Sequence, residues 1–337
     1  MEGKSKDPLL QIRHLKKYFD IPGKGKLHAV DDISLDIMPN ETLGLVGESG
    51  CGKSTVGKIL VRLLEATSGE VMFQGKDLLN LDKKEMNEIR QKIQIIFQDP
   101  YSSLNPRKTV RSILEVPFKE HLKLSKSEME QKILELAERT GLEPYVLDMY
   151  PHELDGGKRQ MVGIARALAL EPQFIVCDEP VSALDVSVQA TIINLLMDLQ
   201  REMNLTSVFI SHDLSVVRHI SDRIAVMYLG QIVEVAETDE IFGNTFHPYS
   251  IALLSAVPKI EFEKKTSRIV LKGDVPSPLN PQPGCRFAPR CWMVCEACKR
   301  ETPELQEVTP GHFVACPYWE KSRENADRIL AEQERVK

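Results

Sequence analysis

The chain has 337 residues, of which 42% are hydrophobic and 27% are charged, and its formal net charge is −6. This composition is ordinary for a globular protein and provides no polybasic surface, which argues against nucleic-acid binding. No run approaches the ~18 consecutive apolar residues of a membrane-spanning helix, and the first residues lack the apolar core of a secretory signal. We therefore expect a cytoplasmic chain of one to three domains, with any membrane span supplied by another polypeptide.

The first predicted elements are strands. Residues about 8–46 alternate apolar and polar side chains, as in LQIRHLKKYF and AVDDISLDI, which predicts the strands of a small sheet. The stretch ETLGLVGESGCGKST then passes from an apolar strand into a glycine-rich turn. Apolar residues follow at helical spacing, at Val56, Ile59, Leu60, Leu63 and Leu64. A helix should therefore begin directly after the turn.

The glycine-rich turn carries the pattern G-x-x-x-x-G-K-[ST] between the predicted strand and helix. Its glycines let backbone N–H groups converge on phosphate oxygens, and the helix N-terminus adds a partial positive charge. Lys53 is placed to pair with the β- and γ-phosphates, and Ser54 to hold Mg²⁺. The full pattern in this context argues against a chance turn. The candidate phosphate-binding residues are Gly47, Glu48, Ser49, Gly50, Cys51, Gly52, Lys53, Ser54 and Thr55.

The middle of the chain, about residues 100–165, is predicted to be mainly helical. Ser127 and Glu130 form a capping-box pattern at the start of one helix, and Gly141 suits its end. From Gln173 the pattern returns to alternating strands and helices.

The predicted strand FIVC delivers Asp178 and Glu179 at its carboxyl end. Asp178 is expected to hold Mg²⁺, directly or through water, and Glu179 to act as general base on an attacking water. An apolar run before Asp-Glu is weak evidence alone, because many strands end in a polar turn. Together with the phosphate-binding pattern at residues 47–54, which is called a P-loop, it indicates a nucleotide hydrolase. SVFI is another predicted strand, and IAVMYLGQIVEV predicts a hairpin that turns near Gly230.

After about residue 240 the composition changes. Prolines and turn residues accumulate between Val275 and Pro289, and cysteines follow. We interpret residues 259–320 as an appended domain and residues 321–337 as a polar helix or tail.

The cysteines of this region are spaced C-x5-C-x6-C-x17-C, with Cys295 in excess. In a cytosolic protein such a cluster indicates metal before disulfides. Four soft thiolates suit an Fe–S cluster or zinc, and free thiols are the remaining alternative. The candidate ligands are Cys285, Cys291, Cys298 and Cys316.

Together the motifs resemble those of the ABC ATPase family, over about residues 8–260. Gln98 in IFQDP matches the family glutamine that senses the γ-phosphate and Mg²⁺. His212 in ISHD matches the switch histidine that contacts the γ-phosphate. Asp185 ends the SALD sequence that matches the D-loop. Tyr18 matches the aromatic residue that stacks on adenine, although Phe19 beside it could do the same.

The resemblance implies an α/β fold and an ATP hydrolase. The ABC cassette, a P-loop NTPase fold over residues 8–258, would combine a RecA-like core, an antiparallel β subdomain and a helical subdomain at about 100–165. The cysteine-rich extension would follow. The expected cofactors are ATP and Mg²⁺, with Ser54, Gln98 and Asp178 around the metal.

The signature motif departs from the family. The usual LSGGQ is LDGGK here, and Gly156 and Gly157 are retained. In the family this motif meets the γ-phosphate of the nucleotide held by the opposite subunit. Asp155 would bring a carboxylate there, which costs several kcal/mol in a dry site. The milder interpretation is that Asp155 caps the helix as serine does and that Lys158 partly neutralises it. We favour a weakened signature.

An altered signature beside intact Lys53, Asp178, Glu179 and His212 predicts a heterodimer with a second, non-identical ABC subunit. The site on this chain's P-loop would hydrolyse ATP. The site completed by Asp155 would bind or turn over ATP poorly.

Three further segments resemble one subfamily: IFQDPYSSLNPRKTV, HPYSIALLSAVP and PSPLNPQPGCRFAPRC. They resemble the ATP-binding subunits of dipeptide and oligopeptide importers, whose relatives carry nickel, and within these the second of two paired subunits. The resemblance implies a peripheral protein at the cytoplasmic face of the membrane. Its partners would be two permease subunits and, through them, an extracytoplasmic peptide-binding protein. It also implies a [4Fe–4S] cluster on the cysteines, with a structural role.

Two other classes compete with the importer. A soluble ABC ATPase of DNA repair or translation usually has tandem cassettes or long coiled-coil insertions, which the sequence lacks. An idle, nucleotide-holding regulatory subunit is compatible with the altered signature, but Glu179 and His212 argue against it.

Overall fold

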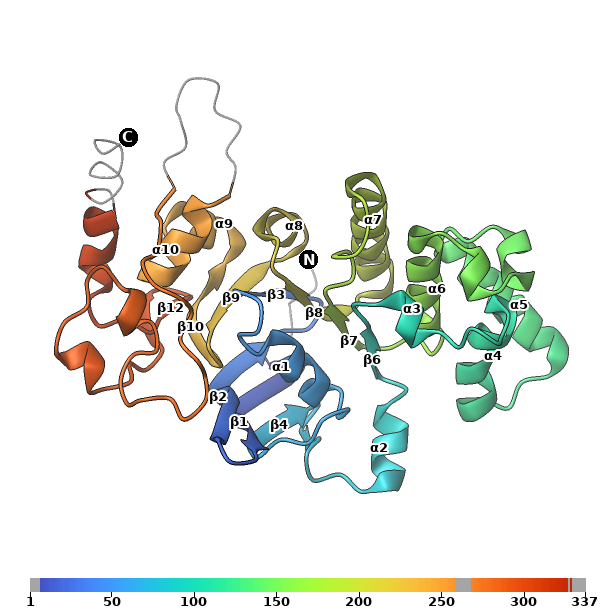
Figure 1. Ribbon diagram of the computed structural model, residues 1–337. Coiled ribbons are helices and arrows are strands. Elements are labelled where there is room, and N and C mark those ends of the chain that lie inside the picture. Colours follow the sequence, from blue (N-terminus) through green and yellow to red (C-terminus); the bar gives the residue numbers. More distant parts are fainter. Residues whose placement is uncertain (1–6, 258–267, 327, 329–337) are drawn as a thin grey trace.

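The computed structural model describes residues 7–257, 268–326 and 328. A large central sheet runs through the molecule, with a small antiparallel sheet beside it, a helical region at one end and the C-terminal segment at the other (Figure 1). The predicted end of the cassette at residue 258 lies outside the described residues, and so does most of the tail predicted at residues 321–337. The predicted α/β class is confirmed.

The central sheet contains eight strands in the order β11-β12-β10-β9-β3-β8-β7-β6. The five strands from β6 to β9 are parallel neighbours, and β10, β12 and β11 continue the sheet antiparallel. The predicted hairpin near Gly230 is confirmed as β9 and β10. The strands are β3 (Thr42–Val46), β6 (Ile93–Ile96), β7 (Phe174–Asp178), β8 (Thr206–Ser211), β9 (Arg223–Tyr228), β10 (Gln231–Glu237), β11 (Gln306–Thr309) and β12 (His312–Val314).

The small sheet has the order β2-β1-β4-β5. Of the strands predicted for it over residues about 8–46, β1 and β2 belong to it, whereas β3 lies in the central sheet. Neighbouring strands are antiparallel, and bulges interrupt the register between β1 and β2. Its strands are β1 (Leu10–Ile21), β2 (Gly25–Ile37), β4 (Ser68–Phe73) and β5 (Lys76–Asp77).

Helices cover both faces of the central sheet. Because side chains alternate along a strand, each strand contributes to two cores. Ile175 and Cys177 of β7 belong to the core with α6, α7 and α8, whereas Phe174 and Val176 belong to the core with α1 and the small sheet. The longer helices are α1 (Lys53–Leu60), α4 (Val110–His121), α5 (Lys126–Arg139), α6 (Gly156–Leu168), α7 (Val186–Met203) and α10 (Pro248–Ser255); the shorter ones are α2 (Lys83–Ile89), α3 (Pro100–Ser103), α8 (Leu214–Ile220) and α9 (Thr238–Gly243).

The predicted helical region is confirmed by α3 to α6, with one correction. Helix α5 begins two residues earlier than Ser127 suggested: Ser125 is its N-cap, and Glu128 completes the capping box. Two overlapping S-x-x-E patterns, at Ser125 and Ser127, were available, and the chain uses the first.

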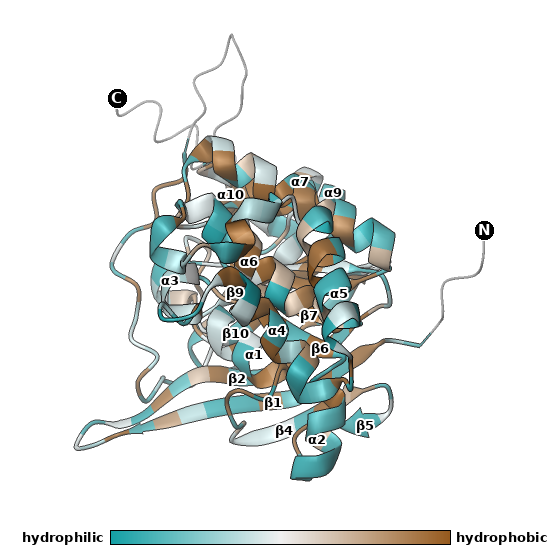
Figure 2. Cartoon of the chain, turned by 90° about the vertical axis from the view of Figure 1, so that its right-hand side faces the viewer, coloured by the Kyte–Doolittle hydropathy of each residue, from teal (hydrophilic) through white to brown (hydrophobic). Residues whose placement is uncertain are grey.

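Among the described residues, none of the helices combines the length and apolar character that crossing a membrane requires. Figure 2 shows the helices as bands of hydrophobic and hydrophilic residues, and α2 as mainly hydrophilic.

The C-terminal segment (residues 245–257 and 268–326) is joined to the rest of the chain through a buried carboxylate. Glu234 on β10 is fully buried. It accepts hydrogen bonds from Thr245 Oγ1 (2.9 Å), Phe246 N (2.7 Å) and His247 N (3.2 Å). Its Oε1 also lies 2.8 Å from His312 Nε2 on β12. One side chain therefore joins β10, the start of α10 and β12.

Replacing Glu234 with glutamine should lower the free energy of unfolding by about 3 kcal/mol. The glutamine NH₂ group would face donors where an acceptor is needed. Glu237, exposed on the same strand, provides the matched control, Glu237→Gln. Urea unfolding of the three proteins checks this, and equal midpoints for Glu234→Gln and the wild type would contradict the assignment of Glu234 as the joining residue.

Candidate functional site

The predicted P-loop lies between β3 and α1, where the backbone is packed too closely for side chains at two positions. Gly47 and Gly52 both have positive φ, 154° and 109°. A Cβ atom at Gly47 would lie 2.1 Å from Met227 O, and one at Gly52 would lie 2.0 Å from Ala29 O. The turn that wraps the helix N-terminus therefore needs glycine at both ends.

Lys53 and Ser54 begin α1 and face this turn. The ammonium of Lys53, a buried residue, donates to Gly47 O (2.8 Å) and Glu48 O (3.1 Å). Ser54 Oγ donates to Asp178 Oδ1 (2.7 Å), which joins the P-loop to the end of β7. Burial raises the pKa of Asp178, and the hydrogen bond from Ser54 opposes this. Two oxygen ligands suited to Mg²⁺ are thus adjacent.

The three predicted catalytic side chains also meet. Gln98 Nε2 donates to Glu179 Oε2 (2.9 Å), and His212 Nδ1 lies 3.3 Å from Glu179 Oε1. The Glu179 backbone has φ of 45°, a left-handed conformation that is costly for a residue with a side chain. Such strain persists only where the surrounding structure holds it, and it is frequent at functional sites.

Tyr18, the predicted adenine-stacking residue, stacks on His28, with ring centroids 3.9 Å apart. Its hydroxyl donates to Asp31, which also pairs with Arg286. Burial alone would raise the pKa of Asp31, but the hydrogen bonds from Tyr18 and His28 and the charge of Arg286 lower it. Asp31 N in turn donates to Gly230 O, and Gly230 N donates to the P-loop at Cys51 O. Tyr18 is thereby tied to the same region.

The signature and D-loop residues pack against each other. A Cβ at Gly156 would lie 3.1 Å from Leu184 Cδ2 in the D-loop, and one at Gly157 would lie 2.6 Å from Val188 Cγ1 on α7. Asp155 caps α6 by accepting from Lys158 N (2.8 Å), and Asp185 caps α7 by accepting from Val188 N (3.0 Å). Gly156 is the first residue of α6.

The Lys158 ammonium has partners other than Asp155. It donates to the Tyr145 hydroxyl (3.0 Å) and lies 4.0 Å from Glu143. Asp155 thus caps the helix, as the milder interpretation expected, whereas the Lys158 ammonium binds Tyr145 and lies near Glu143, and does not bind the Asp155 carboxylate.

Sequence reasoning missed the contacts that the C-terminal segment makes with the P-loop. Arg290 pairs with Glu48 through two bonds, Nη1 to Oε2 (2.8 Å) and Nη2 to Oε1 (3.2 Å). Tyr249, at the start of α10, accepts a hydrogen bond from Glu48 N (2.9 Å). Burial disfavours the charge of Arg290, but the hydrogen bonds to Glu48 and Tyr228 raise its pKa above the ordinary value. An acidic residue inside a phosphate-binding loop was the available signal.

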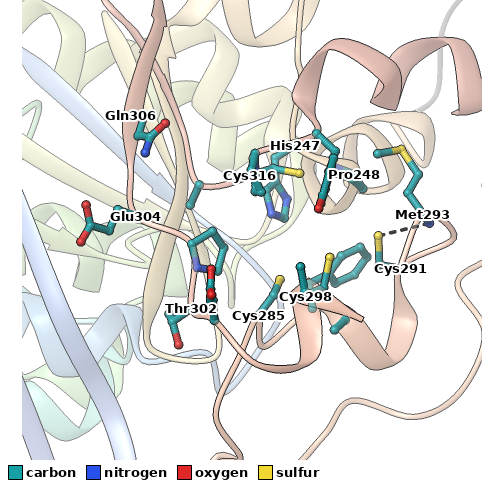
Figure 3. A pocket seen from close by; sticks show the side chains of 18 residues that line it. His247, Pro248, Cys285, Cys291, Met293, Cys298, Thr302, Glu304, Gln306 and Cys316 are labelled. Carbon is teal, nitrogen blue, oxygen red and sulfur yellow. Dashed lines mark hydrogen bonds between the residues drawn. The ribbon is translucent and has the colours of Figure 1, made fainter. Parts of the chain in front are cut away.

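The four predicted cysteine ligands line one pocket of about 510 Å³ (Figure 3). Burial raises the pKa of Cys291 to about 12 and that of Cys316 to about 11, and it also raises the pKa of Cys285. Cys295 Sγ lies 3.4 Å from Cys298 Sγ. Within the described ranges, no group of three or more His, Cys, Asp or Glu side chains is arranged to hold a metal ion.

Comparison with known proteins identifies the family. Residues 30–182 match the family described as "ABC transporter", and residues 233–298 match "Oligopeptide/dipeptide transporter, C-terminal region". The oligopeptide transport ATP-binding protein AppF of Bacillus subtilis (strain 168) is 50% identical over 94% of this chain and 99% of its own. The dipeptide transport ATP-binding protein DppF of Haemophilus influenzae is 48% identical over 94% and 98%.

Solved structures support the same assignment. The dimeric bacterial ABC transporter cassette MJ0796 matches with a TM-score of 0.63 at 31% identity, over 68% of this chain and 98% of its own. CbiO1 of Clostridium perfringens, part of the transporter complex cbiONQ, matches with a TM-score of 0.63 at 27% identity, over 71% and 92%. The chain belongs to the ABC transporter ATP-binding proteins, and within them to the group of oligopeptide and dipeptide transport subunits.

Proposed function

We propose that this protein binds and hydrolyses ATP to energise the import of dipeptides or oligopeptides by an ABC transporter. The observation that carries the proposal is the meeting of the P-loop, the Ser54–Asp178 pair and the Glu179–Gln98–His212 group at the carboxyl ends of adjacent strands. The peptide-transport names of relatives that match nearly the whole chain support the solute class.

Each side chain has a role that its position allows. Lys53 and the P-loop amides would hold the phosphates, and Tyr18 the adenine. Ser54, Asp178 and Gln98 would surround Mg²⁺, which neutralises charge on the phosphates when bound. Glu179 would take the proton of the attacking water, and His212, beside it, would contact the γ-phosphate. The paired contacts of Glu179 with Gln98 and His212 hold its carboxylate in place for this task.

The transporter would supply the remaining parts. Two permease subunits would span the membrane and meet the helical region between residues 98 and 165, with this chain peripheral at the cytoplasmic face. An extracytoplasmic peptide-binding protein would deliver the solute. Differential affinity of open and closed ATPase dimers for ATP would drive the permeases. Nickel chelates or another small solute, or a soluble non-transport role, are the alternative readings.

The ATPase activity of the complex that co-purifies with this chain from its own membranes should rise when short peptides and the matching binding protein are added. Activity without them provides the baseline, and the binding protein without peptide is the control. Hydrolysis that peptides do not change would direct the solute assignment to nickel chelates or other small molecules. Purification without any membrane partner would favour the soluble ATPase.

We also propose that the chain works in a heterodimer, as the second of two paired ATPase subunits. Asp155 caps α6, and in the proposed dimer its carboxylate would lie in the motif that faces the partner's nucleotide. A carboxylate that approaches a γ-phosphate in a dry site is repelled. The site completed by Asp155 would therefore turn over slowly, and the site on this chain's P-loop would carry the hydrolysis.

Replacing Glu179 with glutamine in the assembled complex should reduce ATP hydrolysis about 100-fold or more, because the general base of the active site is lost. The corresponding substitution in the partner subunit is the control and should have a small effect. Hydrolysis near the wild-type rate in Glu179→Gln would contradict the unequal heterodimer.

The cysteine-lined pocket would hold a [4Fe–4S] cluster, with zinc as the alternative. The donor set supports this, because four cysteine side chains from residues 285 to 316 line the same space. Among the described residues, no three of them are arranged around a single metal position. Four thiolates on one zinc ion, at about 2.3 Å each, must lie within about 4 Å of one another. A cluster binds each thiolate at a different iron and so accepts ligands that are farther apart. The cluster would tie the segment together, outside the path of the ATP reaction.

Protein purified anaerobically should be brown, absorb near about 400 nm and contain iron. Cys291→Ser should lose the absorbance, because it removes one of the four lining thiols. Cys295→Ser is the matched control and should keep it. Colourless, iron-free wild-type protein would contradict the cluster, and stoichiometric zinc in that protein would support the alternative.

A further inference from the structure

The P-loop of this chain carries a negative charge where it is expected to bind an anion. Glu48 directly follows Gly47, and its carbonyl oxygen accepts from the Lys53 ammonium (3.1 Å). The residue is thus part of the turn that faces the phosphates. A carboxylate only a few bonds from the phosphate-binding atoms opposes the binding of ATP, whose phosphates carry several negative charges.

Arg290 is arranged to cancel that charge. Its guanidinium binds both carboxylate oxygens of Glu48, at 2.8 and 3.2 Å, in the two-bond geometry that is characteristic of strong arginine–carboxylate pairs. The Arg290 side chain is 9% exposed and that of Glu48 28% exposed, so the pair is partly shielded from water. The two residues are separated by 242 positions in the sequence, so the pair exists only when the C-terminal segment is docked on the cassette.

The surrounding structure holds Arg290 in this position. It ends a short 3₁₀ turn, Ala288–Arg290, in which Arg290 N donates to Phe287 O (2.9 Å). Phe287 is fully buried and packs edge-on against Tyr228, with ring centroids 5.3 Å apart. Tyr249 contacts the backbone of Glu48 at the same place. The segment therefore presents a fixed cation to the P-loop.

We propose that Arg290 is a positioning residue of the nucleotide site, which neutralises Glu48 and so permits tight binding of ATP. The inference rests on the proposed function, because it requires that the P-loop bind ATP. It makes the C-terminal segment, which the cassette match at residues 30–182 does not include, a working part of the ATP site.

Arg290 would make the same contacts if it only held the C-terminal segment on the cassette, so the test must separate the effect of charge from that of packing. Arg290→Ala leaves Glu48 charged and unpaired, and ATP should bind about tenfold more weakly. Glu48→Gln removes the carboxylate charge and provides the reference affinity with which the double variant is compared. In the double variant the offending charge is gone, so affinity should return to that of Glu48→Gln. Arg290→Lys keeps the charge without the two-bond geometry and should be intermediate.

The affinity of the full-length proteins for ATP is measured by calorimetry, in low and in moderate salt and at matched metal content. The deficit of Arg290→Ala should shrink as salt rises, because ions screen the repulsion. Arg300→Ala removes an exposed cation from the same segment and is the matched control. Thermal unfolding of each variant verifies that it is folded.

The proposal would be overturned if the double variant bound ATP as weakly as Arg290→Ala and if salt did not change the loss of affinity. Arg290 would then have only a structural role. Wild-type protein that binds no ATP would instead overturn the proposed function. Recovery in the double variant, together with the salt response, supports the electrostatic role.

Discussion

The parallel pairing of β3, β8 and β7 is the constraint on which the site depends. In this register Val46 lies opposite Ser211, and Asp178 lies opposite Ile210, so the three strands end at the same edge of the sheet. The first residue of the P-loop, Gly47, directly follows β3, and Glu179 and His212 directly follow β7 and β8. Because side chains alternate along a strand, a shift of one residue in any pairing would turn its last side chain to the opposite face. The backbone hydrogen bonds of the sheet therefore fix the distances among the proposed catalytic groups.

Much of the cassette was predictable from local patterns. A stretch of about fifteen residues is enough to predict each of three features: the strand, glycine-rich turn and helix around Lys53, the strand that ends at Asp178, and the hairpin at Gly230. The start of α5 was misplaced by two residues because Ser125 and Ser127 offer equivalent caps. The clustering of Gln98, Glu179 and His212 could be expected only through the family resemblance, since nothing in their spacing along the chain brings them together.

The parts that sequence did not reveal are long-range polar contacts. Arg290 meets Glu48 and Arg286 meets Asp31 across more than two hundred residues. Glu234 forms hydrogen bonds both with the residues that precede α10 and with His312 on β12. Such pairs leave no periodicity, because each requires only one charged residue at each end. The strands β11 and β12 were missed because they are short and because β10, on which β12 pairs, already had a partner in the predicted hairpin.

These contacts make the segment from Cys285 to Cys291 common to two sites. Within seven residues it contributes two cysteines to the pocket and two arginines, one to Asp31 beside Tyr18 and one to Glu48 in the P-loop. The 3₁₀ turn between the cysteines leaves little freedom to move one set without the other. If Arg290 acts as proposed, thermodynamic linkage requires that an occupant of the pocket that favours the docked arrangement of these arginines also strengthen nucleotide binding, and that nucleotide strengthen the binding of that occupant by the same factor. In this chain, the segment from Cys285 to Cys291 would therefore connect the cysteine-lined pocket to the proposed ATP site.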